Sequence, residues 1–243
     1  MNSQRRLALS SALVCFPLTL ALAGCDAVFS PAIPGSGISK EEARPVASFS
    51  EIEVANAIEL DATIGPAADL LITTDDNILP HVRTEVEGDR LRIYLDGSYS
   101  TDLGVKVKVI APELRALLGS GASTTKLSGV AGDQFELDLS GASRCQLAGD
   151  AEVLKVDLSG ASQCTIEGRA KEVRIDCSGA SQLDATGLTA ETVVADLSGA
   201  STAHVKATAE LIADASGAST LHYAGQPAKL EKNTSGASTI ASE

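Results

Sequence analysis

Aromatic side chains are scarce in this chain. Its 243 residues include no tryptophan, one methionine, four phenylalanines and three tyrosines, although 44% of the residues are hydrophobic. The apolar content therefore consists mainly of alanine, valine, leucine and isoleucine. A wide globular core normally uses bulky aromatic side chains for part of its burial. The composition instead predicts a thin core that small aliphatic side chains fill at regular intervals.

Positive charge is scarce as well. The chain has 19 lysines and arginines against 32 aspartates and glutamates, which gives a net charge of −13 at pH 7 with neutral histidines. Such an acidic surface is repelled by nucleic acid phosphates and by anionic lipid headgroups. We therefore expect no nucleic acid partner, and any membrane attachment must come from something other than surface charge.

A four-residue phrase, Ser-Gly-Ala-Ser, is repeated through residues 119–243. Its seven copies begin at Ser120, Ser140, Ser159, Ser178, Ser198, Ser216 and Ser235, so successive copies are 18 to 20 residues apart. A fixed period of this length indicates a solenoid. Apolar and polar residues alternate on both sides of the phrase, which predicts a strand, a corner at the phrase, a second strand, a glycine turn and a third short side. The glycine of the phrase suits a tight corner because it tolerates positive φ. The sequence thus predicts an all-β fold, a single-stranded parallel β-helix with coils of about 19 residues.

The residues before the repeats alternate too. Two runs of period two, at 82–86 and 91–95, flank a Glu-Gly-Asp turn and predict a β-hairpin. We expect residues 46–118 to form an antiparallel or mixed β region that caps the first coil, because a bare solenoid end exposes unpaired backbone. Residues 25–45 are rich in proline and glycine and lack periodicity, so we expect a flexible tether there.

The first 24 residues have the pattern of an export signal. Arg5 and Arg6 precede an apolar run over residues 7–22 that is too short for a spanning helix. The run ends in Leu-Ala-Gly-Cys25, which resembles the bacterial lipobox, where signal peptidase II cleaves before a lipid-modified cysteine. We predict a lipoprotein signal peptide over residues 1–24, lipidation at Cys25, and membrane attachment at the cell envelope through this N-terminal lipid. Either the inner or the outer membrane fits, and an ordinary secretory signal is the alternative.

The repeated Asp-Leu-Ser-Gly-Ala-Ser coils carry a family resemblance. Together with the Phe-Ser-Glu-Ile-Glu-Val stretch at Phe49 and the Thr-Glu-Val-Glu-Gly-Asp stretch at Thr84, they are similar to the auto-transporter adhesin family with the head GIN domain, found in bacterial surface and periplasmic proteins. The resemblance covers about residues 46–240. It implies a right-handed parallel β-helix and an adhesin-like role, and it supplies no catalytic residues.

Alignment of the coils places one acidic residue two positions before each phrase, pointing outward. These residues are Asp138, Asp157, Asp176, Asp196 and Asp214. Carboxylates stacked in this way repel one another. Hydrogen bonds from the amides or serine hydroxyls of each corner would relieve the repulsion, and so would Ca²⁺ bound between the carboxylates.

Alignment also stacks Asp184, His204 and His222 at one outward position, three residues after the phrase. These side-chain types suit Zn²⁺ or another transition metal. Parallel side chains of one ladder converge poorly, however, so we expect no bound metal and no cofactor.

Three cysteines fall on inward positions. Cys145 and Cys164 should stack in adjacent coils about 4.8 Å apart, so they form either a disulfide or two buried thiols that act as small apolar groups. Cys177 stands alone on its ladder and is expected in the core.

The sequence favours a non-catalytic binding or structural module. The coils are close to minimal and have no long inserted loops that would build a catalytic groove, so a polysaccharide-active enzyme is the weaker alternative. A signalling or stress-related platform for envelope proteins is a further one. Specificity should reside at variable outward positions beside the phrase, of which Arg144, Gln163 and Gln182 are the candidates for contact with a ligand. A glycan or an envelope protein would be the partner, and the polar last coil suggests a monomer or a weak dimer.

Overall fold

The computed structural model describes residues 32–243, and both the predicted signal peptide and Cys25 lie outside the described residues. The described part is built from strands, with one short 3₁₀ turn, η1 (Leu79–His81). Within residues 32–243, no helix has the length and apolar character needed to cross a membrane.

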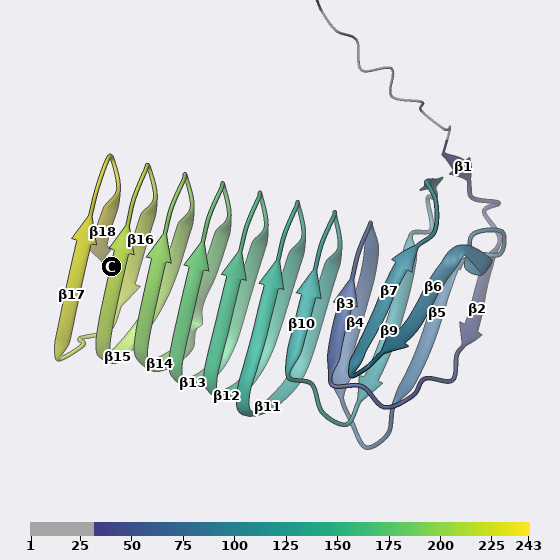
Figure 1. The fold of residues 1–243 in the computed structure, drawn as a ribbon, viewed down its shortest axis with the longest axis horizontal. Coiled ribbons are helices and arrows are strands. Elements are labelled where there is room, and N and C mark those ends of the chain that lie inside the picture. The colour runs from purple at the N-terminus through teal and green to yellow at the C-terminus, as the bar shows by residue number, and fades with distance from the viewer. Residues whose placement is uncertain (1–31) are drawn as a thin grey trace, which may run out of the picture. The chain divides into compact units, whose positions relative to one another are not determined.

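The repeats form a parallel β-solenoid, as predicted (Figure 1). Each complete coil is one long strand that starts just after one phrase, bends near its middle and ends just before the next phrase, so the expected third side is not a separate strand. Neighbouring coils pair in parallel over almost their whole length. The strands of this region are β10 (Ala116–Gly119), β11 (Thr124–Leu139), β12 (Arg144–Leu158), β13 (Gln163–Cys177), β14 (Gln182–Leu197), β15 (Thr202–Ala215), β16 (Thr220–Ala224), β17 (Lys229–Thr234) and β18 (Thr239–Ser242).

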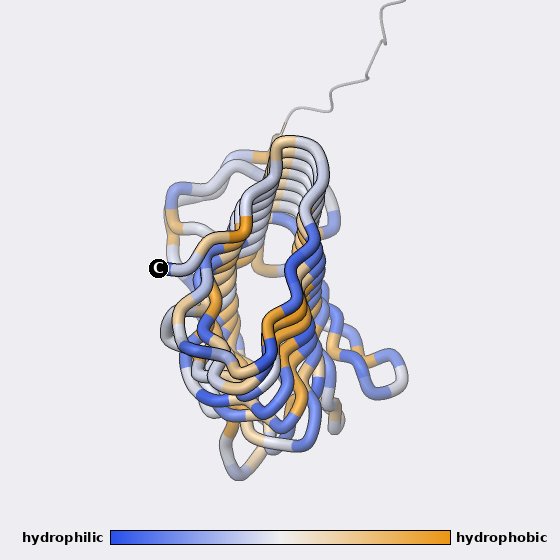
Figure 2. The backbone as a smooth tube through the Cα atoms, turned by 90° about the vertical axis from the view of Figure 1, so that its left-hand side faces the viewer, coloured by the Kyte–Doolittle hydropathy of each residue, from blue (hydrophilic) through white to orange (hydrophobic). Residues whose placement is uncertain are grey.

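The solenoid is flattened, with two walls that meet at the narrow corner formed by the phrases (Figure 2). We call the outer surface of the strand halves that follow the phrases the post-phrase face; it comprises the first halves of β11 to β15 together with β16 and β18. The pre-phrase face is the outer surface of the second halves of β11 to β15 together with β17. Inward residues of both walls are buried, and the ladder Leu137, Val156, Ile175, Ala195 and Ala213 is one example. Burial of each such leucine or isoleucine contributes about 1.5–3 kcal/mol.

The phrase itself builds the corner. Its glycine has φ near 71° in coil after coil, as at Gly141 and Gly160, and the alanine N–H that follows donates to the glycine carbonyl of the preceding coil at 2.7 Å. The last serine is buried in the first six copies. In four of the seven copies its hydroxyl donates to the carbonyl of the first serine of the same phrase, for example from Ser143 to Ser140 at 2.8 Å, whereas the hydroxyls of Ser123, Ser162 and Ser181 have no hydrogen-bond partner within residues 32–243. The serine hydroxyls that are bonded therefore satisfy backbone carbonyls rather than one another, and the phrase recurs because each coil needs the same corner.

Part of the region expected to be a separate cap continues the solenoid. β3 (Glu51–Val54) and β4 (Ile58–Ile64) stack in parallel on β10 and β11, and β7 (Arg90–Leu95) and β9 (Val105–Ala111) stack in parallel on β3 and β4. These pairs are two further coils, so residue 118 is not a structural boundary. The cap proper consists of the antiparallel strands β5 (Asp69–Asp75) on β9 and β6 (Val82–Glu87) on β7, and β6 and β7 form the expected hairpin.

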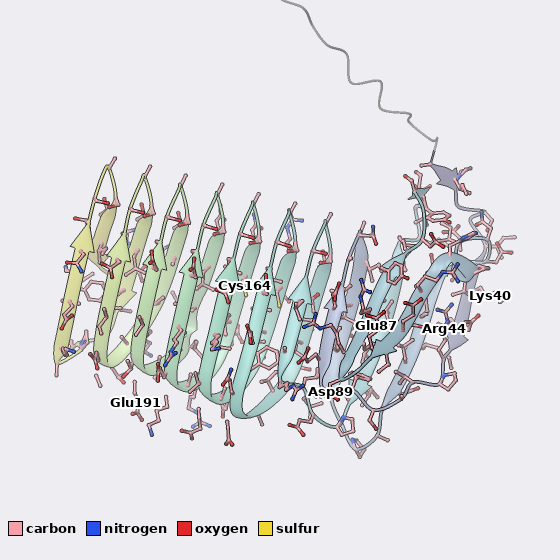
Figure 3. The ribbon with its side chains drawn as sticks, viewed as in Figure 1. Lys40, Arg44, Glu87, Asp89, Cys164 and Glu191 are labelled. Carbon is pink, nitrogen blue, oxygen red and sulfur yellow. The ribbon has the colours of Figure 1, made fainter. Side chains whose placement is uncertain are left out.

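The second half of the expected tether is folded. β1 (Ile33–Pro34) pairs with β8 (Tyr99–Ser100), and β2 (Ser39–Ala43) pairs antiparallel with β5. The Arg44 guanidinium donates to the carbonyls of Leu79 and Val82, and the buried Asp75 carboxylate accepts the Gly37 N–H at 2.6 Å (Figure 3 shows Lys40 and Arg44 at this end). The tether prediction is therefore wrong for this part of the chain. β2 is an edge strand with both sides largely exposed, so it needs no alternation of apolar residues.

Candidate functional site

The post-phrase face carries a shallow groove of about 530 Å³. It crosses the first halves of β12 to β15, and polar side chains from two outward positions of each strand form its walls. The lining residues that point outward are Arg144, Gln146, Gln163, Thr165, Gln182, Asp184, Thr202 and His204, above a floor that includes the buried Cys145, Cys164 and Leu183. The groove lies beside the phrases, where the sequence placed the variable outward positions.

Three proposed ligand-facing residues lie next to one another in this groove. Arg144 is the register partner of Gln163, and Gln163 is the register partner of Gln182. All three side chains are exposed. Arg144 Nε donates to Gln163 Oε1 at 3.3 Å, and within residues 32–243 the guanidinium forms no ion pair. The structure thus aligns one cation and two amides along the solenoid axis.

Asp184 is the next outward residue after Gln182 on β14, and it also lines the groove. Its carboxylate accepts the hydroxyl of Thr186 at 2.7 Å and the backbone N–H of the same residue at 3.1 Å. These hydrogen bonds, with a smaller contribution from the nearby His204, lower the pKa of Asp184 below its ordinary value. This aspartate is therefore ionised at neutral pH and already satisfied within its own strand.

The predicted alignment of Asp184, His204 and His222 is present, since the three are successive register partners. The two imidazoles stack face to face with ring centroids 4.9 Å apart, and His204 Nδ1 lies 2.6 Å from Glu243 Oε1. Stacked rings of parallel strands do not point toward a common centre. In residues 32–243 no three histidine, cysteine, aspartate or glutamate side chains are arranged to hold a metal ion.

The ladder of five aspartates that the sequence alignment predicted is present on the pre-phrase face. Each aspartate is exposed and paired in register with the next, for example Asp157 with Asp176. None of the five carboxylates accepts a hydrogen bond or ion pair from residues 32–243, so the expected bonds from corner amides and hydroxyls are absent. The corner amides bond to backbone carbonyls instead, and the corner hydroxyls either do the same or have no partner within the described residues. Desolvation, followed by neighbouring carboxylates, raises the pKa of Asp157, and desolvation and Glu136 raise that of Asp138.

The three core cysteines are free thiols. Cys145 and Cys164 are register partners, and a hydrogen bond between their side chains, together with burial, raises the pKa of Cys164 well above its usual range. Burial raises the pKa of Cys177 to about 12. Cys145 and Cys164 fill the core beneath the groove, whereas Cys177 ends β13 in the wall of the pre-phrase face. Within residues 32–243 none of the three thiols is hydrogen-bonded to a base that would activate it.

A difference in charge between the two faces was not predicted. Outward positions of the pre-phrase face, in β11 to β15 and β17, carry nine acidic and three basic side chains. The corresponding positions of the post-phrase face carry two acidic side chains, Glu167 and Asp184, and three basic ones, Lys126, Arg144 and Lys206. The negative charge of the solenoid is therefore concentrated opposite the groove. Counting charge separately for the two outward sets of the aligned coils would have revealed this from the sequence.

The fold and the family agree. Residues 48–227 match the family described as "Putative auto-transporter adhesin, head GIN domain", and the chain belongs to this family. Membership supports an adhesin-like, non-catalytic role and a protein associated with the cell envelope or surface.

Solved structures share the fold. A "putative adhesin" from Bacteroides fragilis is similar with a TM-score of 0.82 and 20% identity, covering 87% of this chain and 100% of the other. A "putative lipid binding protein" from Parabacteroides distasonis has a TM-score of 0.72 and 19% identity, with 88% and 100% coverage. A "putative adhesin" from the same species has a TM-score of 0.70 and 24% identity, with 88% and 100% coverage. Comparison with curated proteins finds no match.

Proposed function

We propose that this protein is a non-catalytic, adhesin-like binding module, anchored at the cell envelope through a lipid on Cys25, and that the post-phrase face is its binding surface. The observation that carries the proposal is the contrast between the two faces of one solenoid. One face concentrates acidic charge, while the other is nearly neutral, polar and grooved. Surfaces of envelope polymers and proteins commonly carry negative charge, so contact through the pre-phrase face would be opposed.

A module of this kind would use many similar contacts rather than one deep pocket. The outward side chains of the groove repeat from coil to coil at about 4.8 Å, so they present a row of hydrogen-bonding groups along the axis. The family description supports an adhesin-like role for such a surface. Partners would be envelope polymers, glycans or other envelope proteins, engaged by a monomer or a weak dimer.

Retention of the purified protein on isolated cell envelopes tests the binding surface. The variant Arg144→Gln/Gln163→Ala/Gln182→Ala should lose most of its retention. The matched control Arg174→Gln/Gln134→Ala makes the same kinds of change on the pre-phrase face, and it should be retained like the unchanged protein. Equal retention of both variants would show that the post-phrase face is not the binding surface.

The anchor is tested separately by metabolic labelling with an alkyne-bearing fatty acid. The unchanged chain should become labelled and partition into detergent, and Cys25→Ser should do neither. Incorporation of label into Cys25→Ser would overturn the assignment of the lipid to this residue.

A further inference from the structure

We infer that the post-phrase groove binds a linear acidic glycan, with Arg144 holding a sugar carboxylate and the amides of Gln163 and Gln182 holding hydroxyls of the following units. This inference rests on the proposed function and names the class of ligand for the same face.

Arg144 is the group that selects for an acid. It is the single lysine or arginine among the residues that line the groove, and within the described chain it has no acidic partner. Its one side-chain hydrogen bond runs from Nε to Gln163, which leaves the terminal nitrogens open to a ligand. A guanidinium presents a fork of donors that matches the two oxygens of a carboxylate.

The amides select for hydroxyl groups. Each glutamine offers an acceptor oxygen and two donor hydrogens, a combination that can bond to neighbouring hydroxyls of a sugar ring. Gln163 and Gln182 are register partners, so the two side chains leave the backbone about 4.8 Å apart along the axis. Thr165 and Thr202 add hydroxyls at the groove wall. A row of such groups suits an extended polymer that lies parallel to the axis.

The groove lacks what other polymers require. None of its lining residues is phenylalanine, tyrosine or tryptophan, so the imidazole of His204 is the one aromatic ring in the lining, which is too few for the stacking of successive nucleic acid bases. One arginine is too little to neutralise a row of phosphates. The outward lining residues also include no large apolar side chain of the kind that anchors protein interfaces.

The distribution of charge around the groove favours a ligand that carries a few carboxylates among neutral units. Lys126 in β11 and Lys106 and Lys108 in β9 lie on the same wall, on the Arg144 side of the groove, with Glu59 and Asp61 of β4 at the register positions between them. With Arg144, the cations outnumber these two carboxylates, so this end favours an anion, whereas Asp184 and Glu243 lie toward the opposite end. A polymer with carboxylates among neutral hydroxyls satisfies both ends, while a densely charged one would be repelled by a protein of net charge −13.

Calorimetric titration with matched polymers tests the inference. The ligands are oligomers of galacturonate, alginate and hyaluronate, each beside its methyl-esterified, uncharged counterpart. At least one acid form should bind the unchanged protein, and its ester should bind about tenfold more weakly, because the charge-assisted bonds to Arg144 are lost. Arg144→Gln should lower the affinity for the acid to that for the ester, whereas Arg174→Gln on the pre-phrase face should change neither.

Each outcome decides the matter. Acid and ester bound equally, or an acid bound equally by Arg144→Gln, would overturn the inference. Failure of every oligomer to bind would also overturn it. The proposed function would still stand if envelope retention depended on the post-phrase face. Thermal unfolding of each variant confirms that these exposed substitutions leave the fold intact.

Discussion

Asn56 and Gly121 occupy the same corner position in adjacent coils, although only one of them belongs to a Ser-Gly-Ala-Ser phrase. The N–H of Ala122, the residue after Gly121, donates to the Asn56 carbonyl at 3.0 Å, and φ is 67° at Asn56 and 71° at Gly121. Among residues 32–243, Asn56 is the one residue other than glycine with positive φ. Its corner therefore begins the stack that the phrases continue.

Substitution of Asn56 tests this role. Asn56→Ala should lower the free energy of unfolding, because alanine in the left-handed region costs roughly 1–2 kcal/mol and because Asn56 Oδ1 accepts the Leu95 N–H at 3.0 Å. Asn56→Gly removes the same acceptor but accepts the same φ, so it should lose less. Urea unfolding measures both. An equal loss of stability in the two variants would show that the positive φ at Asn56 is not the reason for the loss.

Later corners require glycine for a second reason. A Cβ at Gly160 would lie 2.6 Å from the Gly141 carbonyl oxygen, whereas a Cβ at Gly88, where φ is also positive at 63°, would have no heavy atom within 4 Å. Gly88→Ala should therefore cost only the conformational penalty of about 1–2 kcal/mol. Gly160→Ala should cost clearly more, because the coils must separate and the 2.7 Å bond from Ala161 to Gly141 is lost.

Hydrogen exchange would show where that loss falls. Contacts in a solenoid run only between neighbouring coils, so Gly160→Ala should speed exchange in β12 and β13 and in coils on the C-terminal side before it affects β3 and β4. Equal destabilisation by Gly88→Ala and Gly160→Ala would contradict the steric explanation.

The regular coils were predictable because their period fixes the structure. Once the phrases are aligned, alternation alone assigns the inward ladders, the aspartate ladder and the register of Asp184 with His204. The earlier coils were not predictable in the same way. The corner at Asn56 lacks the phrase, and β7 and β9 stack beneath β3 and β4 although they follow them in the chain.

Long-range polar contacts also escaped prediction. The segment at Gly37 is held by Asp75 and Arg44 is held by carbonyls near η1, and no local pattern in the sequence connects these positions. The groove needed the structure for a different reason. Arg144, Gln163 and Gln182 were expected to contact a ligand, but the hollow that they share with outward residues of four strands is seen only in the three-dimensional structure.

The aspartate ladder should make stability depend on pH in a predictable direction. Since the pKa of Asp157 is raised in the folded protein, its share of stability is fully present below the ordinary pKa near 4 and is lost as the pH rises through the raised value. Asp157→Asn should therefore raise the free energy of unfolding at pH 7, by roughly 0.2–1 kcal/mol for removal of like charges on adjacent strands, and should have little effect at pH 3.

Asp150, in the same strand, provides a control because its pKa is shifted in the opposite direction to that of Asp157. Its pKa is lowered chiefly by the side chain of Arg169, 3.1 Å away, so its contribution is present above the ordinary pKa and is lost as the pH falls through the lowered value. Asp150→Asn should therefore lower stability at pH 7. If thermal unfolding at pH 7 shifted in the same direction for both variants, the local environments would not be the cause.

The core thiols should be unreactive while the protein is folded. Thiolates react with alkylating reagents, and the raised pKa values of Cys164 and Cys177 keep both groups protonated at neutral pH. Cys164 lies beneath the groove and Cys177 lies in the core of the pre-phrase wall (Figure 3 labels Cys164). Iodoacetamide at pH 7.5 should therefore leave Cys145, Cys164 and Cys177 unmodified in the native protein and modify all three in urea, as peptide mass spectrometry would show. A cross-linked peptide containing Cys145 and Cys164 would contradict the free thiols of the structure. Rapid native modification of Cys164 with Cys177 protected would instead show that the wall opens at the groove, since both thiols would react together if the whole solenoid unfolded.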